Sequence, residues 1–173
     1  MIVVGRSLST RGGFTLIELL IVIAIIGILS SIVLSSLERA REKAYFSRAQ
    51  GEFHQIETAL ANYYLENGKY PDDVDRDLPS GIEEELSSGN WPEAPWPGSV
   101  YDWDNWDSIG VAQISIRFCD IGETDLDNCN FPNDDWAEDF GVNSAVYFCL
   151  EGDCRSHVNE PEDYPGYCIN CSD

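Results

Sequence analysis

The sequence predicts an α+β fold in which one long N-terminal helix packs, by its second half, on a small antiparallel β-sheet head. Two observations support this prediction. Apolar residues run almost without interruption from Phe14 to Leu37 and then recur at helical spacing as far as Tyr64. Helical spacing is absent after Tyr70, where short apolar segments bounded by Gly, Asn and Asp indicate strands. A helix and a sheet that each have one apolar face can cover one another.

The composition indicates one acidic domain with an appendage. The chain has 173 residues, with 31 acidic against 10 basic ones and a formal net charge of −21. Hydrophobic residues make up 43% of the chain, which is enough for a packed core and argues against a disordered protein. Most of the acidic residues follow Tyr70. Because nucleic acid is bound by Lys and Arg, this charge excludes it as a direct partner.

The first part of the chain is predicted to be a membrane anchor. Residues 1–13 contain Arg6 and Arg11 and no acidic residue, and the apolar run of residues 14–37 follows them. About 20 apolar residues span a bilayer as a helix, and the preceding arginines favour a cytoplasmic N-terminus. A conventional secretory signal has a shorter apolar region and an Ala-x-Ala-like cleavage site, which are absent here. Glu18 is the one charged residue inside the run.

The helix is predicted to continue without a break through residues 38–66. Charged side chains occupy the faces next to its apolar stripe, and Asn67-Gly68 followed by Pro71 is a helix stop. A helix over residues 14–66 would be about 80 Å long, so its N-terminal half should project from a small domain. The apolar stripe comprises Leu37, Ala40, Ala44, Ala49, Phe53, Ile56, Leu60 and Tyr63 or Tyr64.

The head is assigned to residues 67–173. A short helix is expected at Ile82–Leu86, and strands are expected at Ser99–Trp103, Val111–Cys119 and Ser144–Leu150. No Ser/His/Asp arrangement or glycine-rich phosphate loop is present, so no enzymatic activity is predicted.

All six cysteines lie in the head, and a clustered even number is typical of a disulfide framework in an oxidising compartment. Cys119 and Cys129 are the favoured single pair, because their bond would close a short loop between a strand end and a turn. The other four can pair in three ways, and their spacing leaves all three open. These four are Cys149, Cys154, Cys168 and Cys171.

Two groups of residues in the head are candidate metal sites. The last four cysteines could bind zinc as thiolates, but an oxidising compartment favours disulfide bonds, so no zinc is expected. Four acidic residues between Cys119 and Cys129 could bind Ca²⁺, although their spacing differs from that of an EF-hand and a solvated acidic loop is preferred. No other cofactor is indicated. The weak calcium candidates are Asp120, Glu123, Asp125 and Asp127.

The tryptophans Trp91, Trp96, Trp103, Trp106 and Trp136 could form a glycan-stacking platform. Aromatic side chains in this number are more often core, so the core interpretation is preferred.

Residues 11–29 read RGGFTLIELLIVIAIIGIL, and they resemble the class III signal of type IV pilins and type II secretion pseudopilins. The resemblance implies cleavage by a prepilin peptidase between Gly13 and Phe14, and N-methylation of Phe14. It also implies that the Glu18 carboxylate pairs with the N-terminal amine of a neighbouring subunit during assembly. Residues 59–71, ALANYYLENGKYP, are similar to the end of the family's long helix.

Residues 95–101, PWPGSVY, loosely resemble a hairpin of the major pseudopilins. The chain departs from the family at Ser35, where many members have a helix-kinking proline, and the calcium loop of major pseudopilins has no residue-by-residue match. The implied organisation is a leader peptide (1–13), a membrane and filament-core helix (14–37), its amphipathic continuation (38–66) and an acidic, disulfide-rich head (67–173).

The resemblance implies a structural subunit of a type IV pilus-like filament. Its partners would be copies of itself and other pilins, the prepilin peptidase, the inner-membrane assembly platform and, before assembly, the membrane. The precursor would lie in the bacterial inner membrane with its head outside, and the mature subunit in an extracellular filament. Two alternatives are a type II secretion pseudopilin and a signal-anchored extracellular protein that binds Ca²⁺ or glycans without polymerising.

Overall fold

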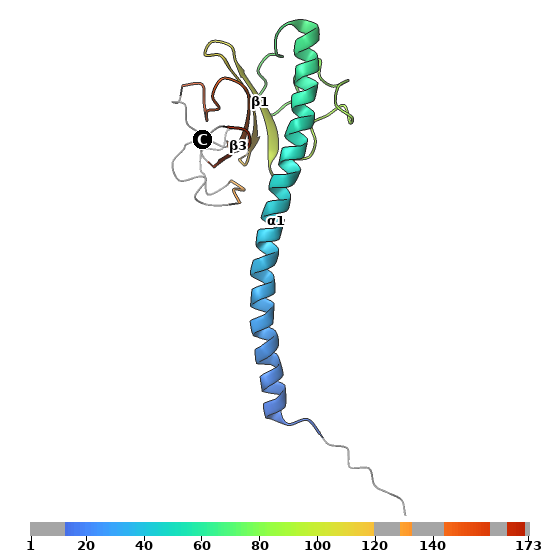
Figure 1. Cartoon of the computed structure of the whole chain (residues 1–173), viewed down its shortest axis with the longest axis vertical. Coiled ribbons are helices and arrows are strands. Elements are labelled where there is room, and N and C mark those ends of the chain that lie inside the picture. Colours follow the sequence, from blue (N-terminus) through green and yellow to red (C-terminus); the bar gives the residue numbers. More distant parts are fainter. Residues whose placement is uncertain (1–12, 120–128, 133–143, 160–165, 172–173) are drawn as a thin grey trace, which may run out of the picture. The chain divides into compact units, whose positions relative to one another are not determined.

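The computed structural model describes residues 13–119, 129–132, 144–159 and 166–171. This part of the chain forms one helix, α1 (Leu16–Asn67), and four strands. The strands are β1 (Val100–Trp106), β2 (Val111–Arg117), β3 (Ser144–Glu151) and β4 (Tyr167–Cys168). Figure 1 shows α1 as one continuous coil and the strands as a small sheet. The α+β prediction of one long helix followed by a small sheet is confirmed.

Local sequence signals set both ends of α1. At its start, the Glu18 amide donates to the Thr15 hydroxyl at 3.3 Å, while the Glu18 carboxylate accepts from the Thr15 amide at 2.8 Å. This reciprocal pattern is a capping box, and it satisfies amides that a helix start leaves without partners. At its end, Gly68 has a φ of 72°, and its amide donates to the Tyr64 carbonyl at 2.8 Å. Glycine adopts this left-handed conformation without steric cost, so the helix stops there.

The chain divides into two compact units, residues 1–43 and 44–173, and α1 contributes to both. In the first unit, every described side chain from residue 13 to 43 is exposed. The second unit contains the head, with the last part of α1 as its helix.

The sheet has the order β1-β2-β3-β4. The pairs β1–β2 and β2–β3 are antiparallel, whereas β4 lies parallel to β3. β1 and β2 form a hairpin in which Trp106 pairs with Val111, and Gly110, with a φ of 68°, closes the turn between them. The three longer strands lie within three residues of their predicted bounds, and β4 was not predicted.

One face of the sheet packs on the second part of α1 and forms the hydrophobic core (Figure 1). The Phe53 ring lies at the centre, with its centroid 5.4 Å from that of Tyr101 and 5.6 Å from that of Phe148. Strand residues two apart point to the same face, so alternate residues of each strand enter this core. Its fully buried members include Phe53, Ile56, Leu60, Tyr101, Trp103, Ile114, Ile116 and Val146.

The other face of the sheet is polar and also buried. Asp102, Asp104, Gln113 and Ser115 all have relative exposures of 6% or less. Gln113 reaches the segment that follows β3: its amide nitrogen donates to the Arg155 carbonyl at 2.8 Å, and its oxygen accepts from the Arg155 amide at 2.9 Å. The hydrogen bonds of Gln113 therefore attach that segment to this face.

The prediction of a short helix at Ile82–Leu86 was wrong, because these residues form turns. Ile82 and Leu86 are buried in the core, while Glu83 and Glu84 between them are exposed. A single turn is therefore enough to place both apolar side chains in the core. The Glu85 amide donates to the Ile82 carbonyl at 3.1 Å, and the Gly89 amide donates to the Leu86 carbonyl at 2.9 Å. So short a segment gains too few hydrogen bonds to offset helix nucleation.

Candidate functional site

The first candidate site is the junction of Gly13 and Phe14, just before α1. Phe14 is 87% exposed, and no heavy atom lies within 4 Å of the position that a Cβ on Gly13 would occupy. The helix begins only at Leu16, so the Gly13–Phe14 peptide bond lies outside the helical hydrogen-bonding pattern. Exposed, non-helical backbone of this kind is where proteases cleave most readily. Arg11 and Gly12 lie outside the described residues.

Glu18 lies one helical turn after this junction, and its partner in the isolated chain is Thr15. The Thr15 hydroxyl donates to the Glu18 carboxylate at 2.7 Å, in addition to the amide contact of the capping box. Thr15 was missed in the sequence analysis. The spacing Thr-x-x-Glu before an apolar run is the sequence signal for a capping box and would have identified it.

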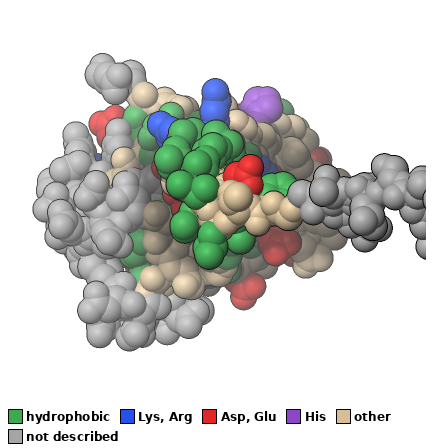
Figure 2. Space-filling view, turned by 90° about the horizontal axis from the view of Figure 1, so that it is seen from below, with side chains coloured by type: hydrophobic (Ala, Val, Ile, Leu, Met, Phe, Trp, Pro, Cys, Tyr) green, Lys and Arg blue, Asp and Glu red, His purple; other side chains and the backbone are tan. Residues whose placement is uncertain are grey.

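The apolar run is an uncovered surface. Between Phe14 and Leu37, the large hydrophobic side chains are 45–87% exposed. Figure 2 shows hydrophobic side chains gathered beside the described start of the chain. In the described part of the chain, α1 is the one helix long and apolar enough to cross a membrane, and its most apolar 18-residue window has a mean hydropathy of 2.9. A surface this apolar needs lipid or protein to cover it.

The buried polar face of the sheet contains an ion cluster of Asp102, Asp104 and Arg117. The Arg117 guanidinium contacts the Asp102 carboxylate and lies 3.3 Å from an oxygen of Asp104. The Gln113 amide nitrogen donates to the other oxygen of Asp104 at 3.0 Å. Burial, and then the negative charge of Asp102, raise the pKa of Asp104 to about 7. With two carboxylates for one guanidinium, the cluster is a structural network whose second acid tends to hold a proton.

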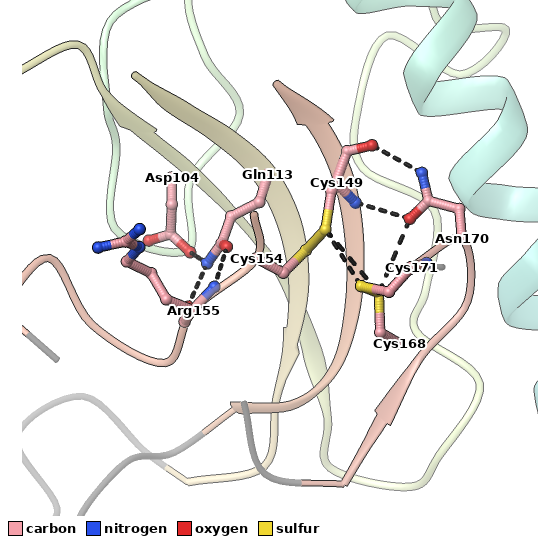
Figure 3. The surroundings of a disulfide bond; sticks show 8 residues. All are labelled: Asp104, Gln113, Cys149, Cys154, Arg155, Cys168, Asn170 and Cys171. Carbon is pink, nitrogen blue, oxygen red and sulfur yellow. Dashed lines mark hydrogen bonds between the residues drawn. A yellow bond between two sulfur atoms is a disulfide. The ribbon is translucent and has the colours of Figure 1, made fainter. Parts of the chain in front are cut away.

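Three disulfide bonds close the head: Cys119–Cys129, Cys149–Cys154 and Cys168–Cys171. The second and third bonds together make up one of the three ways in which the last four cysteines could pair. These last two bonds are close neighbours, because all four of their sulfur atoms lie within 4.8 Å of one another. We call Cys149, Cys154, Cys168 and Cys171 the sulfur cluster (Figure 3). Sequence spacing could not show that the two pairs meet.

The remaining candidates fall into two groups. Asp120, Glu123, Asp125 and Asp127 lie outside the described residues, as does Trp136. The other four tryptophans are buried or half-buried: Trp96 and Trp103 belong to the core, and the Trp103 indole donates to the Pro71 carbonyl at 3.2 Å. Trp91 is half-buried and packs against this core, whereas Trp106 is half-buried outside it, with its ring centroid 6.3 Å from that of His157. None of these four tryptophans is fully exposed.

Comparison with known proteins matches the segment that contains the Gly13–Phe14 junction, Glu18 and most of the apolar run. A family profile described as the prokaryotic N-terminal methylation motif matches residues 8–34. The chain belongs to the type IV pilin and type II secretion pseudopilin family, whose members are structural subunits and not enzymes. No solved structure matches.

Named relatives come from both branches of this family. A type II secretion system core protein G of Klebsiella pneumoniae is 36% identical over 105 residues, which cover 54% of this chain and 74% of the relative. The core protein G of Pectobacterium carotovorum is 40% identical over 67 residues (39% of this chain, 43% of the relative). The type IV major pilin protein PilE1 of Neisseria gonorrhoeae is 43% identical over 64 residues (37% and 39%). The chain thus spans less than half the length of the last two relatives.

Proposed function

We propose that this protein is a structural subunit of a type IV pilus-like filament and assembles through its N-terminal helix. The observation that supports this most is the uncovered apolar surface of residues 14–37, preceded by an exposed Gly13–Phe14 junction inside a methylation motif. Residues 1–13 would be the leader peptide that prepilin peptidase removes. The precursor would be anchored in the inner membrane by this helix, with residues 67–173 outside as the head.

Assembly would exchange lipid contacts for contacts between helices. Cleavage after Gly13 frees the amine of Phe14, which is then methylated, and the Glu18 carboxylate of an adjacent subunit neutralises that amine. A carboxylate in hydrocarbon costs about 2.5–3.5 kcal/mol on insertion scales, so it favours a site that offers a cation. The capping box gives Glu18 polar contacts before assembly, since Thr15 supplies two donors within its own chain. The inner-membrane assembly platform would bring the subunits together.

A second candidate function is that of a type II secretion pseudopilin, whose short filament moves proteins across the outer envelope. It is favoured by the core protein G relatives, one of which this chain covers over 74% of its length. The two functions share the same processing and the same assembly helix. They differ in whether the filament extends from the cell surface or acts within the envelope.

The experiment is intact-mass analysis and N-terminal sequencing of the protein purified from its own membranes, followed by immunogold microscopy of the cells. A mature chain that begins at N-methyl-Phe14, together with labelled surface fibres, is expected. Correct processing with no surface fibres and with impaired secretion in the deletion strain would favour the pseudopilin. A mature chain that begins at Met1, or after the apolar run, would overturn both.

A further inference from the structure

We propose that the sulfur cluster is a zinc site in the thiol form of the chain, with Cys149, Cys154, Cys168 and Cys171 as its four ligands. Binding of one Zn²⁺ and formation of two disulfide bonds would then be alternative fates of the same four sulfur atoms. This proposal does not depend on the function of the N-terminal helix.

The distances between the two cysteine pairs fit a tetrahedral zinc site. Sulfur atoms bound to zinc at about 2.3 Å in a tetrahedron are about 3.8 Å apart. The Cys149 sulfur lies 3.8 Å from that of Cys168 and 3.4 Å from that of Cys171, and these pairs share no covalent bond. Only the two bonded pairs need to separate, each within a cluster whose four sulfurs already lie within 4.8 Å.

The backbone holds the cluster together independently of the sulfur–sulfur bonds. Cys149 lies on β3, and Cys168 ends β4, which pairs with β3 so that Tyr147 is opposite Cys168. The Ile169 amide extends this pairing by donating to the Tyr147 carbonyl at 2.9 Å. These contacts keep the two halves of the cluster adjacent when the cysteines are thiols.

Asn170 adds a second link between the two halves (Figure 3). Its side-chain nitrogen donates to the Cys149 carbonyl at 2.6 Å, and its side-chain oxygen accepts from the Cys149 amide at 2.8 Å. Asn170 lies between Cys168 and Cys171, so this contact places both of those sulfurs over Cys149. Residues that orient metal ligands in this way contribute to metal affinity.

The surroundings of the sulfur atoms also suit thiolates and a cation. The Cys171 amide donates to the Cys168 sulfur at 3.2 Å, and a hydrogen bond to the charged form of a thiol favours that form. Cys154 is buried and the other three cysteines are half-buried, which limits the access of competing water. The net charge of −21 raises the local concentration of divalent cations.

Zinc binding and disulfide formation differ in the protons and electrons that leave the thiols. Zinc binding converts four thiols into four thiolates with release of four protons, and no electron is transferred. Disulfide formation transfers four electrons and four protons from the same thiols to two equivalents of a disulfide oxidant, which become dithiols, and leaves no thiolate to bind metal. Zinc bound first should therefore protect these thiols from oxidation and alkylation.

The test uses the full chain in detergent, kept reduced with a phosphine, and Co²⁺ and Zn²⁺ as probes. We expect one Zn²⁺ per chain, and visible Co²⁺ absorption typical of a tetrahedral thiolate site that Zn²⁺ abolishes. The matched control Cys119→Ala/Cys129→Ala should bind like the wild type. Cys168→Ala/Cys171→Ala should weaken binding by at least about a hundredfold, and Asn170→Ala by about tenfold.

Alkylation with iodoacetamide provides a second measurement that does not require the apo chain to be folded. Zinc should protect all four thiols of the Cys119→Ala/Cys129→Ala variant. The proposal is overturned if the reduced wild type shows neither metal binding nor zinc-dependent protection. It is also overturned if Cys168→Ala/Cys171→Ala binds as tightly as the wild type, or if the control variant loses binding.

Discussion

At the scale of single residues, the Glu18 carboxylate has a partner within its own chain, Thr15, in addition to the amine of a neighbouring subunit that is proposed for the filament. Its carboxylate accepts from both the amide and the hydroxyl of Thr15, so it begins the helix in the isolated chain. A new positive charge nearby would compete with these neutral donors, because hydrogen bonds between ionised groups are the stronger kind. Under the proposed assembly, the same carboxylate would cap the helix in the precursor and pair with the amine in the filament.

We predict that Glu18→Ala leaves processing and membrane insertion intact but sharply reduces incorporation into filaments. The change deletes the proposed charge partner and makes the segment more apolar, so the anchor itself should not be weakened. The matched control is Glu38→Ala, an exposed acid of the same helix outside the apolar run. Cell fractionation and immunogold microscopy measure both steps. Normal fibres from Glu18→Ala would show that this carboxylate has no role in assembly.

The second residue-scale prediction concerns Asp104 and pH. Its folded pKa of about 7 lies above the ordinary value of 3.8, so the protonated form is favoured in the folded state. The stability from this group is therefore complete below about pH 4 and is lost as the pH rises through about 7. Burial also raises the pKa of Asp73, which acts in the same direction.

We expect Asp104→Asn to reduce this fall in stability between pH 5 and pH 8, by an amount on the order of a few kcal/mol. Asn keeps the shape and removes the charge, while Asp102 still pairs with Arg117. Asp107→Asn, in the exposed hairpin turn, is the control. Urea unfolding followed by tryptophan fluorescence at both pH values measures the effect. An equal pH dependence in Asp104→Asn and wild type would contradict it.

At the scale of elements, α1 has two surfaces with different requirements. Its first part exposes a continuous apolar surface, whereas its last part contributes residues such as Phe53 that are fully buried within the head. The hydrophobic effect treats both surfaces alike, so the difference lies in what is present to cover them. In the second unit, the sheet is the cover.

We predict that Phe53→Ala lowers the free energy of unfolding of the head by about 3–5 kcal/mol, because it leaves a cavity in the centre of the core. The same truncation at Leu65, which is 81% exposed on the same helix, should change it by less than about 0.5 kcal/mol. Urea unfolding of the detergent-solubilised chain compares the two. Equal effects would mean that this part of α1 is not packed on the sheet.

At the scale of the whole molecule, the cross-links lie within the head, and each spans a short stretch of chain. The sequence separations of the bonded cysteines are 10, 5 and 3 residues, so no bond joins the head to the N-terminal unit. Short loops remove limited entropy from the unfolded chain. The packed core and the buried sheet face must therefore supply most of the stability.

We predict that Cys119→Ala/Cys129→Ala lowers the stability of the oxidised head by about 2.7 kcal/mol, the loop-entropy value for a separation of 10 residues. Thermal unfolding of the oxidised protein, with the wild type beside it, measures the change. We expect the variant to fold at low temperature and to unfold at a lower midpoint temperature than the wild type. An unchanged midpoint would show that this bond does not constrain the unfolded chain.

Local patterns determined the helix and the longer strands. The stop at Gly68 and the alternation of Ile114 and Ile116 are properties of neighbouring residues, so the sequence alone predicts them. The anchor and the resemblance around Gly13, Phe14 and Glu18 are likewise local in sequence. The expectation at Ile82–Leu86 failed because two buried side chains four residues apart can be placed by one turn as well as by a helix.

Only the tertiary structure decided which distant groups meet. β4 has two residues and no periodic pattern, so its pairing with β3 follows from contacts that no local signal encodes. Two acidic residues, Asp102 and Asp104, would suggest a solvent-exposed strand. In the fold, β2 brings Arg117 beside them, and both carboxylates are buried. The sulfur cluster has the same origin: parallel backbone pairing brings four cysteines together, whereas their spacing along the chain left three disulfide pairings and a zinc site as alternatives.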